Sequence, residues 1–126
     1  MEQYEHTCMI RGDGGKAIRA ILDRICDKWT MLVVATLDEG RMRFSHLHQH
    51  IPGISQRMLT LTLRNLERDG LVSRTAYAEV PPRVEYELTT RGKSLIPPAL
   101  ALARWAIEHN GAIQDSRTTY DDSRSK

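Results

Sequence analysis

The chain has 126 residues, of which 40% are hydrophobic and 27% charged, and its formal net charge is +2. This composition is ordinary for a soluble globular protein, and the length suits one domain with a modest core. No run approaches the roughly 18 apolar residues of a membrane span, and the polar N-terminus lacks the hydrophobic stretch of a signal peptide. Two cysteines are too few for a disulfide scaffold. We therefore expect a cytoplasmic protein with free thiols and no membrane association.

The first two elements are expected to be helices. Residues 16–25 form an amphipathic helix because apolar residues recur at helical spacing, namely at Ile18, Ile21, Leu22 and Ile25. Asp27 can cap a second helix over residues 28–38, which Gly40 would end. This second helix is apolar nearly all round, which indicates burial on most sides and a subunit interface as well as a core.

The segment with the most one-sided charge is Arg41–Leu66, which holds four arginines and three histidines but no Asp or Glu. In a nearly neutral chain, such a segment is the electrostatic footprint expected for a polyanion partner. The same segment predicts two short helices joined by a turn at Pro52-Gly53, with Ser55 as the N-cap of the second. This is the outline of a helix-turn-helix, whose second helix enters a DNA major groove.

The second of these helices, expected over residues 55–69, buries a leucine stripe and exposes polar side chains. The exposed residues can be assigned to DNA groups by their chemistry: Gln56 to adenine, Arg57 to guanine, Thr60 and Leu61 to a thymine methyl group, and Arg64 to a phosphate. The alternative is a solvated helix face with chance arginines. The missing carboxylates and the exposed Leu61 favour double-stranded DNA as the partner.

After Gly70 the hydrophobic period changes to two, which predicts a β-hairpin. The expected strands are residues 71–77 and residues 83–88, and apolar and charged residues alternate in the second strand. Between them, residues 78–82 carry two adjacent prolines, which stiffen the tip because proline cannot donate to a strand ladder. Arg83, just past this tip, is either a contact of a DNA-binding wing or an ordinary strand-end arginine.

Thr89 can cap a last helix with a broad apolar side. Pro97-Pro98 either kinks this helix or marks its true start. Because little domain core is left for the apolar side to cover, a partner subunit is its expected contact. The polar tail from Gln114 onward is expected to fray.

The order of elements predicts a mainly α fold with a small β-hairpin, a winged helix-turn-helix with a helical extension. We expect a flexible arm over residues 1–15, the winged domain with its dimer helix over residues 16–110, and a polar tail over residues 111–126.

Several residue groups allow a chemical role but have a simpler explanation. His46 and His50 have the spacing of a zinc pair, but no third ligand is evident, so we interpret them as polar residues on a DNA-facing helix. Arg41 and Arg43 are either phosphate contacts or plain surface charges. Because no nucleophile–base signature, Gly-rich phosphate loop or HExxH motif is present, we expect no enzyme, metal or cofactor.

The cysteines and tryptophans leave alternatives open. Cys8, on the expected arm, is either a redox sensor or a spectator thiol. Cys26 follows an apolar stripe and is interpreted as a buried small hydrophobic residue. Trp29 and Trp105 are interpreted as core or interface packing, with a ligand pocket between the dimer helices as the alternative.

The chain resembles the HxlR family of bacterial winged-helix transcription regulators in three segments: LDRICDKWTMLVV, RFSHLHQHIPGISQRMLTLTLRNLERDGLVSRTAY and VPPRVEYELTTRGKSL. The resemblance covers approximately residues 18–107. It implies a cytoplasmic homodimer, with the first and last helices at the dimer interface and the helix over residues 55–69 in the major groove. Members repress or activate transcription, and several respond to electrophiles, oxidants or aldehydes. The candidate interface residues are Ile18, Leu22, Trp29, Leu102, Trp105 and Ile107.

The chain departs from the family pattern at three positions. Lys16 stands where redox-sensing members carry a cysteine, Cys26 stands where glycine is usual, and Leu61 stands where a polar residue is more usual. The sequence therefore predicts a sequence-specific DNA-binding regulator that acts as a homodimer on a pseudo-palindromic operator. One alternative is a thiol- or small-molecule-responsive sensor whose input acts at the dimer helices. The other is a winged helix used only for protein contacts.

Overall fold

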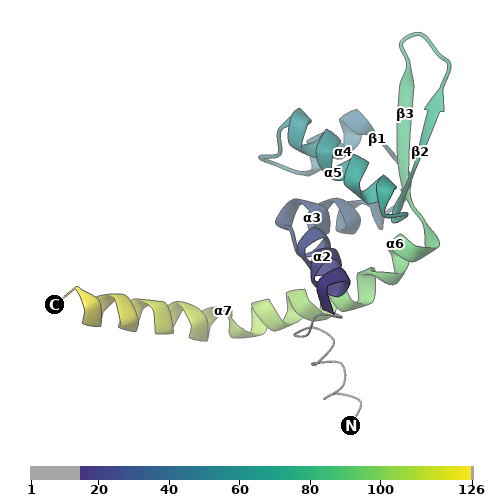
Figure 1. Ribbon diagram of the computed structural model, residues 1–126. Helices are drawn as coiled ribbons and strands as arrows, with labels where there is room; N and C mark the ends of the chain where they lie inside the picture. Colours follow the sequence, from purple (N-terminus) through teal and green to yellow (C-terminus); the bar gives the residue numbers. More distant parts are fainter. Residues whose placement is uncertain (1–14, 126) are drawn as a thin grey trace. The chain divides into compact units, whose positions relative to one another are not determined.

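The computed structural model describes residues 15–125 (Figure 1). The chain divides into two compact units, residues 1–93 and residues 94–126. The first unit contains, in chain order, α2 (Lys16–Ile25), α3 (Lys28–Leu37), β1 (Met42–Arg43), α4 (Phe44–His50), α5 (Gln56–Arg68), β2 (Val72–Tyr77) and β3 (Arg83–Leu88). The short helix α6 (Thr90–Ser94) ends at the boundary, and α7 (Ile96–Arg124) forms the second unit. The elements confirm the predicted winged helix-turn-helix.

The two N-terminal helices begin where the sequence predicts. Asp27 caps α3 as expected, because its Oδ2 atom accepts hydrogen bonds from the backbone N–H groups of Trp29 and Thr30 at 3.2 and 3.3 Å. The interior of α3 lies in the core. By contrast, α2 has no fully buried residue, so its apolar face is incompletely covered in the single chain.

The helix-turn-helix is held by local features that the sequence predicts. Gly53 has a φ of 89° in the turn, and Gly70 has a φ of 77° after α5, a region that favours glycine. Ser55 caps α5, since its Oγ accepts a hydrogen bond from the Met58 N–H at 3.0 Å. The buried side of α5 packs against α3 and comprises Leu59, Thr62, Leu63 and Leu66.

The core of the first unit gathers where α3, α4, α5 and the sheet meet. Its most fully buried side chains are Val33, Val34, Leu37, Leu47, Leu59, Leu63 and Leu66. All are aliphatic, so the core fixes the position of α5 by close packing. The face of α5 opposite this core is exposed.

The sheet has three antiparallel strands in the order β1-β3-β2. The hairpin β2–β3 was predicted, and it projects beyond the helices as a wing (Figure 1). The strand β1 was not predicted, because its two residues are too few for a period of two to appear. It pairs with β3 and places Arg43 opposite Glu85. The start of α4 is thereby attached to the base of the wing.

Apolar and charged residues alternate along β3, but buried and exposed side chains do not. The register places Tyr77 opposite Arg83 and Thr75 opposite Glu85, so the charged residues do share one face of the sheet. They are nevertheless half-buried rather than exposed. The reason is that these side chains pair with one another and cover that face, as described below.

The junction between β3 and α6 is closely packed. The Thr89 hydroxyl accepts a hydrogen bond from the Gly92 N–H at 3.1 Å and donates one to the Gly70 carbonyl at 2.6 Å. Thr89 is therefore a cap, as predicted, but the helix it caps is only the short α6. The same hydroxyl ties the end of the wing to the end of α5.

The long helix α7 starts with Pro97 and Pro98 in its first turn, so the prolines mark a helix start rather than a kink. The helix continues to Arg124, and the expectation of a frayed tail from Gln114 is therefore wrong. Like α2, α7 contains no buried residue. Within residues 15–125, no helix combines the length and the apolar character that a membrane crossing needs.

Candidate nucleic-acid interface

The exposed face of α5 carries a stripe of basic residues around one leucine. Arg57, Leu61, Arg64 and Arg68 are exposed, and their spacing of four, three and four positions puts them on one side of the helix. Within residues 15–125, none of these three arginines forms an ion pair with a carboxylate. Their charges are free to meet an anion. We call this set the α5 basic stripe.

Arg68 extends the stripe beyond the residues to which the sequence assigned a DNA contact. Its position opposite the leucines was visible in the sequence, but its place near the end of α5 gave no reason to assign a contact. The structure shows it exposed in the last turn, where its charge also complements the helix dipole.

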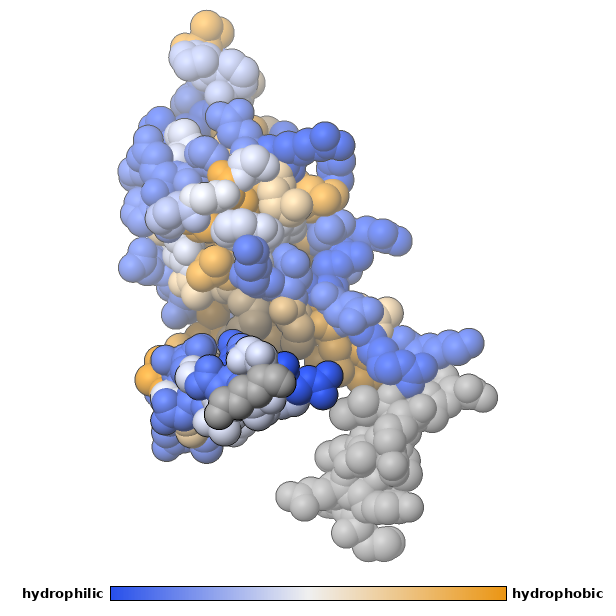
Figure 2. Space-filling view, turned by 90° about the vertical axis from the view of Figure 1, so that its left-hand side faces the viewer, coloured by the Kyte–Doolittle hydropathy of each residue, from blue (hydrophilic) through white to orange (hydrophobic). Residues whose placement is uncertain are grey.

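The first turn of α5 exposes the two residues best suited to read bases. Gln56 and Arg57 are both exposed beside the Ser55 cap. The Thr60 hydroxyl donates a hydrogen bond to the Gln56 carbonyl at 2.8 Å, so its methyl group remains for an apolar contact. The side of the molecule on which the α4–α5 turn lies is largely hydrophilic, with scattered hydrophobic patches (Figure 2). Such a surface suits a polar, charged partner.

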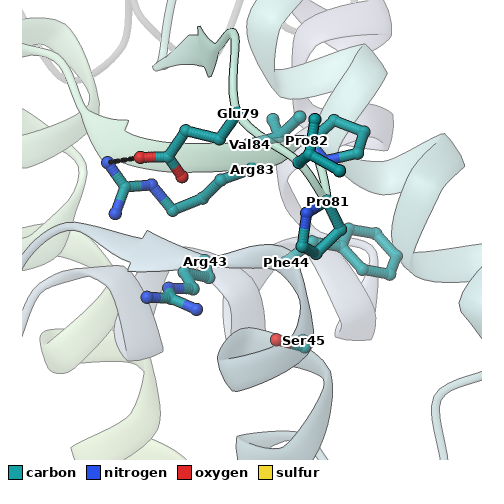
Figure 3. A pocket seen from close by; sticks show the side chains of 9 residues that line it. Arg43, Phe44, Ser45, Glu79, Pro81, Pro82, Arg83 and Val84 are labelled. Carbon is teal, nitrogen blue, oxygen red and sulfur yellow. Dashed lines mark ion pairs between the residues drawn. The ribbon is translucent and has the colours of Figure 1, made fainter.

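A groove of about 760 Å³ separates the wing from the start of α4 (Figure 3). Its lining includes Arg43 and Phe44 on one side and Glu79, Pro81 and Arg83 on the other. Arg43 is exposed, and in the described part of the chain it has no ion-pair partner. Both interpretations of Arg43, a phosphate contact and a plain surface charge, are compatible with this geometry, and the phosphate contact stays a prediction.

Arg41 is held at the base of the wing instead. It lies 3.2 Å from Glu87 and 3.6 Å from Glu85 and donates a hydrogen bond to the Tyr77 hydroxyl at 2.8 Å. The hydrogen bond to Glu87, together with its charge, raises the pKa of Arg41 above the ordinary value. Its charge is balanced by its neighbours, which favours a structural role.

Arg83, the candidate wing contact, is also paired. Its guanidinium lies 3.4 Å from Glu79 and 3.4 Å from Glu85, and stacks 4.1 Å from the centre of the Tyr77 ring. Arg83 is thus held by two glutamates in the folded chain, and a contact between Arg83 and DNA stays a prediction. The register explains the stacking, since Tyr77 and Arg83 are directly opposite in the hairpin.

The histidines of α4 make local contacts. The His50 Nδ1 lies 2.8 Å from the His46 carbonyl oxygen, and the two rings meet edge to face. The His48 Nε2 lies 2.9 Å from the Ile54 carbonyl oxygen, across the turn. Among residues 15–125, no three His, Cys, Asp or Glu side chains gather as a metal site.

The structure places one of the two cysteines, Cys26, and does not describe the other, Cys8. Cys8 lies outside the described residues. Cys26 is exposed, so the prediction that it is buried is wrong. It is the C-cap residue of α2, one position past a helix that itself has no buried residue.

The candidate interface residues lie on three helices. On α2, Ile18 is half-buried and Leu22 is exposed. On α3, Trp29 is half-buried near Gly53 of the turn. On α7, Leu102 and Trp105 are each 53% exposed and Ile107 is 77% exposed.

Helical geometry separates the three candidates of α7. Leu102 and Trp105 are three positions apart and share one side of the helix. Ile107 follows Trp105 by two positions and faces the other way. The ring of Trp105 lies against His109, with 4.6 Å between the ring centres. The apolar side of α7 is therefore centred on Leu102 and Trp105.

Known proteins similar to this chain are also helix-turn-helix proteins. The family profile described as HxlR-like helix-turn-helix matches residues 24–114. An HTH-type transcriptional regulator of Methanothermobacter thermautotrophicus is 52% identical over 100 residues, which cover 79% of this chain and 76% of the relative.

Two solved structures extend this likeness to the fold. The transcriptional regulator YtfH of Salmonella typhimurium superposes with a TM-score of 0.73 at 35% identity, covering 79% of this chain and 89% of YtfH. The redox regulator HypR in its reduced form superposes with a TM-score of 0.72 at 38% identity, covering 79% of this chain and 99% of HypR.

Proposed function

The chain belongs to the HxlR-like helix-turn-helix family of DNA-binding transcriptional regulators, and we propose that it binds a pseudo-palindromic operator as a homodimer, with α5 in the major groove. The observation that carries the proposal is the α5 basic stripe. Three arginines, which have no carboxylate partner among residues 15–125, face outward from the second helix of a helix-turn-helix. That helix is the one that this motif inserts into DNA.

The side chains of α5 divide into base contacts and phosphate contacts. Gln56 and Arg57 occupy the first turn, which enters the groove most deeply, and can bond adenine and guanine bidentately. Leu61 and the methyl group of Thr60 offer an apolar contact to thymine. Arg64 and Arg68 lie further along the stripe and can hold the backbone. Ser55 caps the helix, and the remaining backbone N–H groups of the first turn can bind a phosphate.

The homodimer is supported by two apolar faces that the single chain leaves open. On α2, Ile21 and Leu22 are exposed, and on α7 the exposed pair is Leu102 and Trp105. We propose that each face packs against a second copy of the chain. Two-fold symmetry would then present two α5 helices to half-sites one helical turn apart, about 34 Å.

The experiment is a footprint on duplexes selected from a random pool by the purified protein. The expected result is two protected half-sites related by two-fold symmetry, with their centres one helical turn apart. A single protected half-site would contradict the dimeric arrangement. Failure to select any sequence would contradict specific recognition by α5.

A second candidate function is a thiol-based or electrophile sensor. The Cys26 thiol is exposed at the end of α2, a helix proposed for the dimer interface, so an adduct there would disturb the packing of two copies. The likeness to HypR, a redox regulator, gives this candidate further support. In a Cys8→Ser background, alkylation should change DNA affinity, and Cys26→Ser should abolish that change. Equal affinity before and after alkylation would contradict it.

Since the relatives are regulators of transcription, we propose neither a catalytic activity nor a cofactor for this protein. A regulator of this kind acts where the chromosome is, so we propose that the protein works in the cytoplasm.

A further inference from the structure

The wing contains a linked set of ion pairs around Arg83. Glu85 is 16% exposed and lies between Arg41 and Arg83, whereas Glu79 is 48% exposed and meets Arg83 from the wing tip. Figure 3 shows Glu79 extended over the Arg83 guanidinium at the edge of the groove that Arg43 also lines. Arg83 therefore has one interior carboxylate partner and one outer partner.

The contacts of Arg83 are long for a guanidinium. Both carboxylates lie 3.4 Å away, whereas a charge-assisted N–H···O bond is typically about 2.7–2.9 Å. The Nε atom is buried and makes no hydrogen bond. This atom faces Glu85 and is closed off from solvent, so a partner from outside the chain reaches the guanidinium at Nη2, the atom that Glu79 meets. The pairing holds Arg83 in place but leaves bonding capacity unused.

A DNA phosphate would compete with Glu79 for the same guanidinium. It carries a full negative charge and accepts bidentate hydrogen bonds from arginine. Glu79 is the exposed partner, so it can swing away while Glu85 and the Tyr77 ring keep the arginine at the edge of the groove. The half-exposed pair is weak, as surface ion pairs generally are.

Building on the proposed function, we propose that Glu79 is a positioning residue that withholds Arg83 from the DNA backbone and thereby lowers the affinity of the wing for DNA. Arg83 becomes a phosphate contact only when Glu79 releases it. Arg43, in the same groove but without a carboxylate partner, contacts phosphate regardless of Glu79. Because phosphates carry no sequence information, the effect of Glu79 is the same on every sequence.

The test is a double-mutant cycle on Glu79→Gln and Arg83→Ala, with binding to a random-sequence duplex measured over a series of salt concentrations. Glu79→Gln should tighten binding roughly three- to tenfold, and the slope of log K against log salt should steepen by about one for each wing. Arg83→Ala alone should change affinity by about twofold or less, because in the parent protein Arg83 contributes little. In the Glu79→Gln background, Arg83→Ala should remove most of the gain.

Arg43→Ala serves as the matched control, since it removes a guanidinium from the same groove. It should weaken binding by a similar factor with Glu or Gln at position 79. The thermal unfolding temperature of each variant shows whether it is folded. A folding defect would weaken DNA binding, whereas the prediction for Glu79→Gln is tighter binding.

Two outcomes would overturn the inference while the parent protein still binds DNA. One is weaker or unchanged binding by Glu79→Gln. The other is a gain of equal size with and without Arg83, which would assign the effect to the charge of Glu79 alone. Absence of DNA binding by the parent protein would overturn both the inference and the proposed function.

Discussion

At the scale of single residues, the arginines of this protein differ chiefly in what lies next to them. Arg57 and Arg64 face solvent from α5, and in the part of the chain that the structure describes neither has a carboxylate partner. Arg41 and Arg83 each lie within 4 Å of two glutamates on the wing. Only the first kind can meet a phosphate or a base without first giving up an ion pair.

Arg57→Ala should cost about 1–3 kcal/mol on the selected operator and relax the base preference at one position of each half-site. The reason is the place of Arg57 in the first turn of α5, where side chains reach base edges. The measurement is affinity for the operator, for operators changed at single positions, and for random DNA.

Arg64→Ala is the matched control, because it removes the same group from the same face about two helical turns further on. It should weaken binding to all sequences by a similar factor. If Arg57→Ala also lost equal affinity on operator and random DNA, Arg57 would be a phosphate contact only.

At the scale of elements, the helix-turn-helix and the hairpin were predictable because their signals are local. Asp27 and Ser55 cap helices with their own side chains, and the leucines of α5 show their spacing within thirteen residues. The pairing of β1 with β3 joins Met42 to Tyr86, and no local pattern indicates it. The ion-pair partners of Arg83 could not be predicted either, because they depend on how the strands are aligned in the sheet.

The length of α7 was missed for a different reason. Its last turns are rich in Ser, Thr and Asp, which favour caps and turns over helix interiors, and they lack an apolar stripe. Likewise, the burial of Cys26 was predicted from an apolar stripe that the single chain does not cover. The polar composition of the last turns thus hid the length of α7, and the apolar stripe of α2 did not reveal whether another part of the chain covers it.

Gly92→Ala should destabilise the first unit by about 1–3 kcal/mol. A Cβ at this position would clash with the carbonyl oxygen of Leu71 and lie 3.1 Å from a methyl group of Leu88. Both neighbours belong to the closely packed junction at the end of the wing. Chemical denaturation is the measurement.

Gly111→Ala is the control for the loss of a glycine. A Cβ there meets nothing within 4 Å, and the residue lies inside α7. Alanine should therefore stabilise that helix by roughly 0.5–1 kcal/mol. A loss of stability at Gly111 as large as that at Gly92 would refute the packing explanation.

At the scale of the whole molecule, the proposed homodimer rests on the exposed apolar faces of α2 and α7. Leu102→Asp should dissociate the homodimer and weaken operator binding, because a charge on the apolar side of α7 would be buried between copies. Sedimentation measures the oligomeric state. Ile107→Asp, on the other side of the same helix, should leave the dimer intact, and dissociation by both variants would contradict this choice of face.

If α5 reads a DNA sequence, the protein must bind the selected operator more tightly than a random duplex, and the measurement is the ratio of the two dissociation constants. The two constants must be measured with the full chain at the same moderate salt concentration, because phosphate contacts depend strongly on salt. Base reading by α5 should give a ratio of roughly 10³ or more in favour of the operator. A ratio near one would contradict it, because the basic stripe would then serve only to hold the DNA backbone.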